Sequence, residues 1–298
     1  MNYYNEIKNE LINNEIYKKS KDYSKNRSDL STYYNVGKLI VEAQGGEIRA
    51  RYGDGLIKEY SKKLTKELGK GYSIRTLKYM RKFYLFQKGQ PTVAQLIWSH
   101  YTILLSLESE DKINYYITRC IKLNLSRDEL RTKIKLKEYE RLDEETKQKL
   151  INTEQLDIKD LVKDPIIIKN KYQPDEINEK MLHQLILEDM DSFLYELGEG
   201  FTYVKSEYKI KIGDTYNYID ILLFNYIYNS FVVVELKVRE LKKEHIGQIL
   251  VYMNYIDENI KSINHNKTIG IIICRENNEF IIKYASDKRI LSKEYQFV

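Results

Sequence analysis

Cysteine, proline and long apolar segments are scarce in this sequence of 298 residues. Apolar runs such as residues 269–274 are far shorter than the roughly 20 residues that a membrane-spanning helix needs, so we expect no membrane association. The first residues show no basic stretch followed by an apolar one, which argues against a secretion signal. The only two cysteines, Cys120 and Cys274, lie far apart within apolar sequence, and we expect both to be reduced core thiols. These absences predict a cytoplasmic protein.

Several sequence signatures of chemistry are missing as well. No group of His and Cys has the spacing of a zinc site, no glycine-rich loop resembles a phosphate-binding P-loop, and no serine nucleophile has an identifiable base. Hydrophobic residues nevertheless make up 42% of the chain, which is typical of a globular protein rather than a disordered one.

The net charge of +5 is unevenly distributed along the chain. Residues 56–88 contain ten basic residues and two acidic ones, a local net charge of +8. A concentrated basic block on an otherwise nearly balanced chain indicates a polyanionic partner, most often nucleic acid. A solvated helix face explains the same charge equally well, so composition alone leaves both interpretations open.

Residues 1–145 show the three- and four-residue apolar spacing of helices, and we predict an all-helical domain there that binds nucleic acid. One helix is predicted over Asp54–Leu68, and a second begins after an N-cap at Ser73 and ends near Phe86. Ser126 is predicted to cap a later helix. The short turn between the first two makes them resemble a helix-turn-helix, which would place the second helix in or across a DNA groove.

The two faces of this second helix differ in chemistry. Ile74, Leu77 and Tyr84 recur at helical spacing and should face the core, with Met80 beside them. The other face carries the basic side chains predicted to bind DNA, which are Arg75, Lys78 and Lys82, with Arg81 bordering them. Long basic side chains without Asn or Gln among them favour contact with phosphates over reading of bases. A solvated face or a surface for a protein partner is the alternative.

The periodicity changes in the second half. It weakens over residues 146–173, where we predict an interdomain linker, and residues 174–298 follow as a second domain. There the pattern predicts a helix over about 175–197, three strands as a meander with a hairpin turn at Gly213–Asp214, a helix over about 242–255, and two strands in "TIGIIIC" and "EFIIKYA". The chain is therefore expected to be an α+β protein of two domains, the second with a mixed sheet flanked by helices.

Three charged residues interrupt the most apolar strands of this second domain. Glu235 and Lys237 are two apart in "VVVELKV", so their side chains share one face of the strand, and Asp220 lies in the preceding antiparallel strand "YIDILLF". Two carboxylates that meet across strands repel each other unless a cation lies between them. A lysine on the same face can orient a water beside the metal, an arrangement that suits phosphodiester hydrolysis. A structural ion pair is the alternative.

This arrangement is the D…(D/E)-x-K pattern of PD-(D/E)XK nucleases, which by itself is a weak signal. The longer stretches that carry the resemblance are "YGDGLIKEYSKKLTKELGKGYSIRTLKYMRKFY", "WSHYTILLSL", "FLYELGEGFTYV", "EHIGQILVYM" and "TIGIIIC". Together they resemble the YhcG-like family of PD-(D/E)XK nucleases, in which a helical domain precedes a nuclease domain. The resemblance implies a restriction-endonuclease-like fold for residues 174–298 and a DNA endonuclease activity.

The resemblance also extends the set of candidate site residues. It implies a role in catalysis for Gln248, on the helix after the Glu235 strand, beside Asp220, Glu235 and Lys237. His245, on the same helical face as Gln248, is expected to be a polar residue at the rim. Since nucleases of this kind often place a carboxylate on the helix before the sheet, Glu188 is predicted to join Asp220 and Glu235 as a metal ligand. Asp189 and Asp191 are the alternatives for this position. We expect Mg²⁺ as the cofactor, with Mn²⁺ able to substitute.

The predicted function is thus metal-dependent hydrolysis of DNA phosphodiester bonds, with the helical domain binding the DNA. The alternative is a nucleic-acid-binding or assembly protein whose nuclease fold is inactive. The sequence leaves open whether RNA is a substrate, whether duplexes, junctions or single strands are preferred, and the oligomeric state, for which a homodimer is one candidate.

Overall fold

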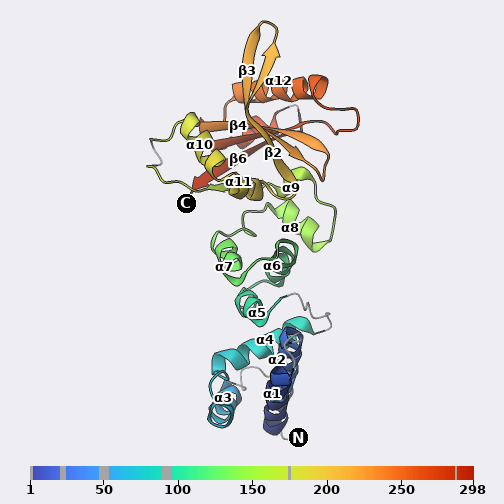
Figure 1. Cartoon of the computed structure of the whole chain (residues 1–298), viewed down its shortest axis with the longest axis vertical. Helices are drawn as coiled ribbons and strands as arrows, with labels where there is room; N and C mark the ends of the chain where they lie inside the picture. Colours follow the sequence, from blue (N-terminus) through green and yellow to red (C-terminus); the bar gives the residue numbers. More distant parts are fainter. Residues whose placement is uncertain (1–2, 21–24, 47–53, 89–95, 174–175, 286) are drawn as a thin grey trace. The chain divides into compact units, whose positions relative to one another are not determined.

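The computed structural model describes residues 3–20, 25–46, 54–88, 96–173, 176–285 and 287–298 (Figure 1). They form two compact units, residues 1–139 and residues 140–298. Unit 1 is helical and unit 2 contains a mixed sheet with helices, so the predicted α+β fold class is confirmed. No helix in these ranges is long and apolar enough to cross a membrane.

Unit 1 follows the helical pattern of its sequence closely. Its helices are α1 (Tyr3–Ser20), α2 (Lys25–Ala43), α3 (Asp54–Leu68), α4 (Ile74–Gln87), α5 (Trp98–Leu104), α6 (Glu110–Leu123) and α7 (Arg127–Lys135). Both predicted caps are present. The backbone N–H of Thr76 donates to Ser73 Oγ at 3.2 Å, and that of Glu129 donates to Ser126 Oγ at 3.3 Å. These bonds satisfy N–H groups that the first turn of a helix leaves unpaired.

The core of unit 1 depends on a close approach between α2 and α4. A Cβ atom on Gly37 would lie 2.1 Å from the backbone oxygen of Met80, so only glycine permits this spacing. Leu77 and Met80 are buried as predicted, whereas Ile74 is 39% exposed and its predicted core position is wrong. Ile74 is the first residue of α4, and helical spacing alone does not show at which turn of a helix the packing begins.

Unit 2 contains the sheet. Its helices are α8 (Glu144–Ile151), α9 (Ile158–Leu161), α10 (Glu179–Glu188), α11 (Met190–Leu197), α12 (Lys243–Asn259) and α13 (Glu279–Lys283). Its strands are β1 (Ile166–Ile168), β2 (Phe201–Ile212), β3 (Thr215–Asn225), β4 (Ser230–Glu240), β5 (Ile269–Glu276) and β6 (Ile290–Phe297). The strand order is β1-β6-β5-β4-β3-β2, with β2, β3 and β4 antiparallel and the remaining pairs parallel.

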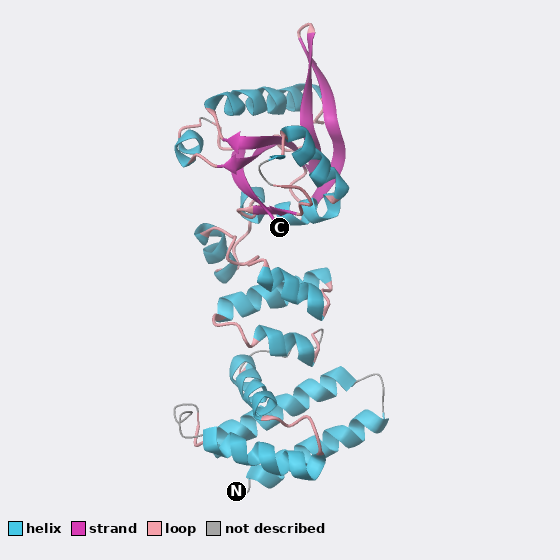
Figure 2. Ribbon diagram, turned by 90° about the vertical axis from the view of Figure 1, so that its left-hand side faces the viewer, coloured by secondary structure: helices cyan, strands magenta, loops and turns pink. Residues whose placement is uncertain are grey.

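Helices cover both faces of this sheet (Figure 2). Alternate side chains of each strand point to opposite faces. Val232 and Val234 pack with residues of α10 and α11, whereas Val233 packs with residues of α12. The central strands are therefore apolar on both sides, and a charged side chain placed there is removed from water.

Residues 146–173 differ from the predicted linker. They contain α8, α9 and β1, and β1 pairs with β6, as in Ile166 opposite Tyr295. The buried Arg141 guanidinium forms an ion pair with Glu196 and donates to the backbone oxygen of Pro165 at 2.7 Å. The backbone N–H of Ile167 donates to the same Glu196 carboxylate at 3.0 Å. These contacts make the segment part of unit 2. The sequence did not predict β1, because a strand of three residues finds its partner only in the folded sheet.

Two more predicted elements differ from the structure. The segment "EFIIKYA" forms α13 rather than a strand, because Asn278 caps it by accepting from the backbone N–H of Ile281 at 3.3 Å, and the last strand is β6. The predicted helix over about 175–197 is two helices that meet at Asp189. The Asp189 carboxylate accepts from the backbone N–H of Ser192 at 3.3 Å and so begins α11.

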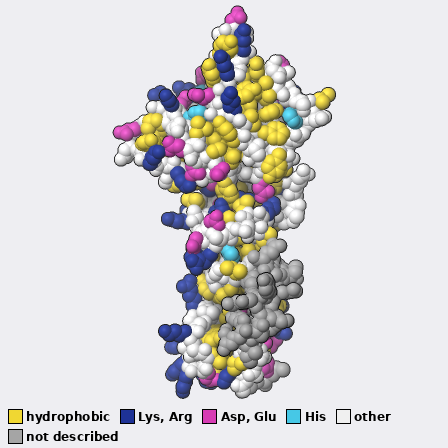
Figure 3. All heavy atoms as spheres, in the orientation of Figure 1, with side chains coloured by type: hydrophobic (Ala, Val, Ile, Leu, Met, Phe, Trp, Pro, Cys, Tyr) yellow, Lys and Arg dark blue, Asp and Glu magenta, His cyan; other side chains and the backbone are white. Residues whose placement is uncertain are grey.

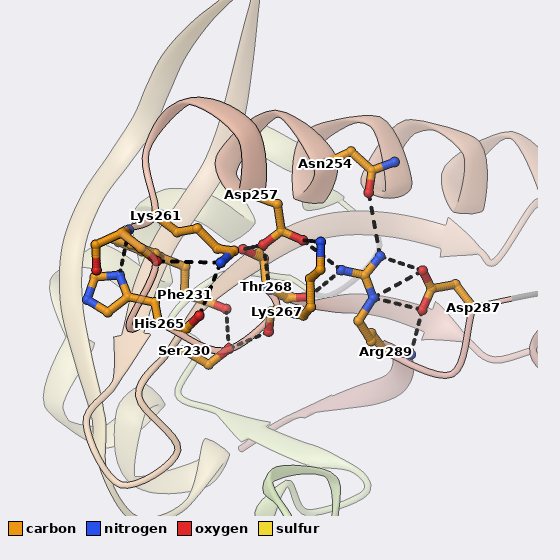
Figure 4. Close-up of polar contacts among 11 residues, drawn as sticks. Ser230, Phe231, Asn254, Asp257, Lys261, His265, Lys267, Thr268, Asp287 and Arg289 are labelled. Atoms are coloured by element: carbon orange, nitrogen blue, oxygen red, sulfur yellow. Dashed lines mark hydrogen bonds and ion pairs between the residues drawn. The ribbon is translucent and has the colours of Figure 1, made fainter.

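A polar network fastens the end of α12 to the starts of β5 and β6 (Figure 4). Asp257 accepts from the backbone N–H and the hydroxyl of Thr268 at 2.9 and 2.8 Å, and from Arg289 Nη1 at 3.0 Å. Arg289 also donates to Asp287 at 2.6 Å. Burial by itself would raise the pKa of Asp257, but the bonds from Thr268 and the charges of Lys267 and Arg289 lower it.

Candidate active site

The site lies where β3 and β4 stop pairing. Their register runs from Asn225 opposite Ser230 to Ile221 opposite Val234, and the next position on each strand is Asp220 on β3 and Glu235 on β4. There the Asp220 carboxylate accepts from the backbone N–H of Leu236 at 2.8 Å. A side chain thus takes a donor that a continuing ladder would give to a backbone oxygen, which holds the carboxylate against β4.

Glu235 and Lys237 project together from β4, as their spacing predicted. Lys237 Nζ lies 3.3 Å from Glu235 Oε2. The Glu235 side chain is almost fully buried, with 2% of its surface exposed. Its second oxygen, Oε1, has no hydrogen-bond partner within the part of the chain that the structure describes. A buried carboxylate oxygen without a partner costs free energy, so it marks a place where a ligand would be stabilising.

Burial and mutual repulsion shape the titration of the two carboxylates. Burial, followed by the negative charge of Asp220, raises the pKa of Glu235 to about 8. Burial also raises the pKa of Asp220, against the opposing effects of the Leu236 bond and the Lys237 charge. At neutral pH the pair therefore retains a proton or gains a cation.

Helix α10 brings two further residues to Asp220 that the sequence analysis did not identify. His183 Nε2 donates to the backbone oxygen of Asp220 at 3.1 Å. Glu179 lies one turn earlier on the same helix, and its negative charge adds a small upward contribution to the pKa of Asp220, which burial raises most. The i, i+4 spacing of Glu179 and His183 at the start of this helix was the available signal.

The predicted metal ligand Glu188 is not part of this group. It is exposed at the end of α10, where its carboxylate pairs with Lys171 at 2.7 Å and accepts from Gln184. Glu188 lies nine residues after Glu179, which at 3.6 residues per turn places it about half a turn around the helix. It therefore faces away from the side of α10 that carries Glu179.

Helix α12 borders the site through its first turns. His245 Nδ1 accepts from the backbone N–H of Lys242 at 3.1 Å, so the ring proton is on Nε2. Burial and then the positive charge of Lys237 lower the pKa of His245, which keeps its ring neutral. Gln248, half-buried on the same helical face, donates to the Tyr252 hydroxyl at 3.1 Å. This hydrogen bond lies within α12 and does not reach the carboxylates.

The donor chemistry of the site fits a hard divalent cation. Among the described residues, no group of three His, Cys, Asp or Glu side chains converges closely enough to hold a metal by itself. Mg²⁺, however, is often held by only one or two protein carboxylates and completes its shell with water and substrate phosphate oxygens. Asp220 and Glu235, with the unpartnered Glu235 Oε1, supply such a pair.

Comparison with known families agrees with this geometry. Residues 159–297 match the family described as the YhcG PDDEXK nuclease domain, and residues 9–141 match the DUF1016 N-terminal domain. This chain belongs to the YhcG-like family of PD-(D/E)XK nucleases. The Escherichia coli (strain K12) protein named "Putative nuclease YhcG" is 27% identical to it over 309 residues, which cover 89% of this chain and 82% of the relative.

Two solved structures are also similar to this nuclease. A repair endonuclease from Pyrococcus abyssi shares 20% identity with a TM-score of 0.29, over 42% of this chain and 48% of that one. The structure titled "EndoMS-dsDNA2 complex" shares 19% identity with a TM-score of 0.28, over 43% of this chain and 48% of that one. In each case the chain covers about half of the solved structure.

Proposed function

We propose that this nuclease hydrolyses phosphodiester bonds of DNA with one divalent cation, Mg²⁺ or in its place Mn²⁺, held by Asp220 and Glu235. One observation carries the proposal: Glu235 Oε1 is buried without a hydrogen-bond partner among the described residues, beside a second carboxylate and a lysine. An apolar core would not retain this arrangement unless a cation or a substrate completed it.

The residues around the two carboxylates have different roles in this proposal. The cation, when bound, supplies a Lewis acid that stabilises charge on phosphate oxygens. The Lys237 ammonium offers three N–H donors on the same face as Glu235, so it can orient the attacking water or a phosphate oxygen. His183 fixes the Asp220 backbone through its bond to the carbonyl. Neutral His245, with its proton on Nε2, is a donor at the edge of the site.

We further propose that unit 1 binds the DNA backbone through α4. The α3–α4 pair with its short turn is helix-turn-helix-like, and Arg75 and Lys78 are exposed on α4. Lys82 Nζ donates to the backbone oxygen of Leu105 at 3.2 Å, and Arg81 Nε donates to Gln44 at 2.7 Å. Lys82 and Arg81 therefore keep only their remaining N–H groups for phosphates. Figure 3 shows Lys and Arg side chains at the lower left of unit 1, the side on which Figure 1 draws α3.

The decisive experiment measures cleavage of a panel of labelled DNA and RNA duplexes, junctions and single strands with Mg²⁺ and with Mn²⁺. Calorimetric titration of Mg²⁺ into the wild type, Asp220→Ala and Asp214→Ala accompanies it. Asp214 is an exposed carboxylate in the β2–β3 turn and serves as the matched control. Metal binding and DNA cleavage that depend on Asp220 but not on Asp214 would support the proposal. Binding that is indifferent to Asp220, with no cleavage, would favour an inactive nucleic-acid-binding or assembly protein.

A further inference from the structure

Unit 1 contains a cavity that the nuclease site does not use. It has a volume of about 410 Å³ and is lined by residues of α4, α5 and α7, together with Ser106 from the segment after α5. The side chains that matter chemically are Arg75 and Tyr79 of α4, Trp98 and Thr102 of α5, and Arg131 of α7. A volume of a few hundred Å³ is typical of sites for small organic ligands.

Two guanidinium groups make this cavity positive. Arg75 donates to the Tyr79 hydroxyl at 3.5 Å and lies 5.6 Å from the centre of the Tyr79 ring, and within the described ranges no carboxylate pairs with it. Arg131 pairs with Asp128 at 3.0 Å, but this exposed carboxylate is shared with Arg127 at 3.2 Å. Two arginines therefore share one negative charge. The cavity retains a net positive charge and planar donors suited to a phosphate.

The Trp98 side chain, which lines one side of the cavity, packs against other aromatic rings of unit 1. The centroid of the Trp98 ring lies 4.5 Å from the ring centroid of Tyr33 and 5.6 Å from that of Phe83. These contacts fix the indole against the core of unit 1. Its remaining surface lines the cavity, as does Tyr79. A supported indole face next to a cationic group is suited to stacking on a nucleobase.

The hydroxyl groups around the cavity are oriented as acceptors. Thr102 Oγ1 donates its proton to the backbone oxygen of Ser99 at 2.9 Å, and Ser106 Oγ donates to that of Ile103 at 2.6 Å. A hydroxyl that has used its proton still offers lone pairs. These groups can accept from the N–H groups of a base, whereas a phosphate, which offers acceptors only, belongs at the arginines.

We propose that this cavity binds one phosphorylated nucleotide unit, with the phosphate at Arg75 and Arg131 and the base on Trp98 and Tyr79. The unit is part of a single-stranded nucleic acid, because a base in a duplex is already stacked and does not present its face. The choice of a strand over a free nucleotide rests on the proposed nuclease function, whereas the nucleotide chemistry rests on the cavity. A strand captured here would be held by unit 1 independently of the carboxylates of unit 2.

The chain carries its own reporter for this site. Trp98 is the only tryptophan in the sequence, so tryptophan fluorescence reports on the wall of this cavity alone. The full chain is titrated in buffer with a chelator, so that no cleavage occurs, with a short single-stranded oligothymidylate, thymidine monophosphate and inorganic phosphate. We expect saturable quenching by the oligonucleotide. Thymidine monophosphate should compete at the same site, whereas inorganic phosphate should compete at least tenfold more weakly than the nucleotide.

Matched variants distinguish this site from general charge attraction. Arg131→Ala should weaken oligonucleotide binding at least tenfold. Arg127→Ala, on the same helix but outside the cavity, leaves Asp128 to Arg131 alone and should weaken binding less than threefold. Arg75→Ala is an independent second variant, since both cavity arginines are exposed and their loss should not unfold unit 1. A monophosphate that binds as tightly as the strand would support the site and make a free nucleotide its ligand.

Three results would overturn the proposal. The first is quenching of Trp98 fluorescence that does not saturate with the oligonucleotide. The second is equal weakening of oligonucleotide binding by Arg127→Ala and Arg131→Ala. The third is inorganic phosphate that competes as well as the nucleotide. The oligonucleotide should quench the fluorescence of Asp220→Ala as it does that of the wild type, because Asp220 belongs to unit 2. A failure of nuclease activity is thereby distinguishable from a failure of this site.

Discussion

The Asp220 carboxylate accepts a hydrogen bond from the backbone N–H of Leu236, at 2.8 Å, where the β3–β4 ladder ends. This one bond places a carboxylate of β3 against the strand that carries Glu235. It also explains how two acidic residues remain close despite their repulsion, since one of them is anchored by the backbone of the other's strand.

The two carboxylates make metal-free stability depend on pH. Because the pKa of Glu235 is raised to about 8 in the folded state, the folded protein holds more protons than the unfolded chain between about pH 4.5 and 8. The free energy of unfolding should therefore fall as the pH rises through this window. Glu235→Gln should lose this dependence and be more stable than the wild type at pH 8, by on the order of 4 kcal/mol, since a pKa difference of one is worth about 1.4 kcal/mol. Urea unfolding at several pH values, with a chelator present, measures the free energy of unfolding of both proteins. The same dependence of this free energy on pH in Glu235→Gln and in the wild type would contradict the prediction.

Cleavage should require both carboxylates. Asp220→Ala and Glu235→Ala are expected to abolish Mg²⁺-dependent cleavage while the protein stays folded, because each removes a metal ligand and relieves the repulsion on the other. Mg²⁺ affinity of the wild type should also rise as the pH approaches about 8, since the cation displaces the proton that the pair retains. Calorimetry in buffers of different ionisation enthalpy detects that proton. Wild-type activity in either variant would remove these residues from the site.

Lys237 should separate chemistry from metal binding. Lys237→Ala is expected to lower kcat by a factor of 100 or more, on the order of a lost positioning group, while Mg²⁺ binding remains. The positive charge of Lys237 lowers the pKa of Glu235, so its loss should raise that pKa further. The rise of Mg²⁺ affinity should therefore move to higher pH. Single-turnover cleavage and calorimetry on the same preparation test this. A variant that binds no Mg²⁺ would instead make the lysine part of the metal site.

The basic face of α4 should contribute phosphate contacts. Replacing Arg75, Lys78 and Lys82 together with Ala should weaken DNA binding similarly for all sequences and flatten the plot of log affinity against log salt by roughly 0.9 per lost contact, up to about 3 units. Because Lys82 also donates to Leu105, we expect a smaller share from it. The matched control replaces Lys38, Lys122 and Lys135, which are exposed on other helices of unit 1. Equal effects of the two triple variants would remove α4 from the DNA-binding surface.

Gly37 should tolerate no side chain. Gly37→Ala places a Cβ atom 2.1 Å from the backbone oxygen of Met80, so α2 and α4 must separate, at a cost of roughly 1–3 kcal/mol or more. Gly55→Ala is the matched control, because nothing lies within 4 Å of a Cβ atom at that helical position. Gly55→Ala should leave stability unchanged or raise it by about 1 kcal/mol. Thermal unfolding followed by circular dichroism compares the two, and equal stabilities would show that the helices pack less closely.

Asp257 should be structural rather than catalytic. Asp257→Asn removes the charge that holds Arg289 and is expected to cost about 1–3 kcal/mol of stability with Mg²⁺ binding unchanged. Since the pKa of Asp257 is lowered in the folded state, its contribution is present above its unfolded pKa and is lost as the pH falls through the folded value. The exposed neighbour Glu258→Gln is the control. A variant that loses Mg²⁺ binding but not stability would contradict this role.

Local signals in the sequence determined much of this protein. The apolar spacing and the caps at Ser73 and Ser126 define helices of unit 1, since each depends on residues within a turn or two. Asp220, Glu235 and Lys237 were identifiable because charge is costly in apolar strands and because residues two apart on a strand share a face.

Only the tertiary structure decided which other side chains reach Asp220. Glu179 and His183 face it, whereas Glu188, an equally acidic residue of the same helix, points away, because the rotation of α10 is set by packing against the sheet. The same holds for β1, whose three residues become a strand only when β6, far along the chain, lies beside them. Contacts between distant segments depend on how whole elements pack, and local spacing carries no information about that.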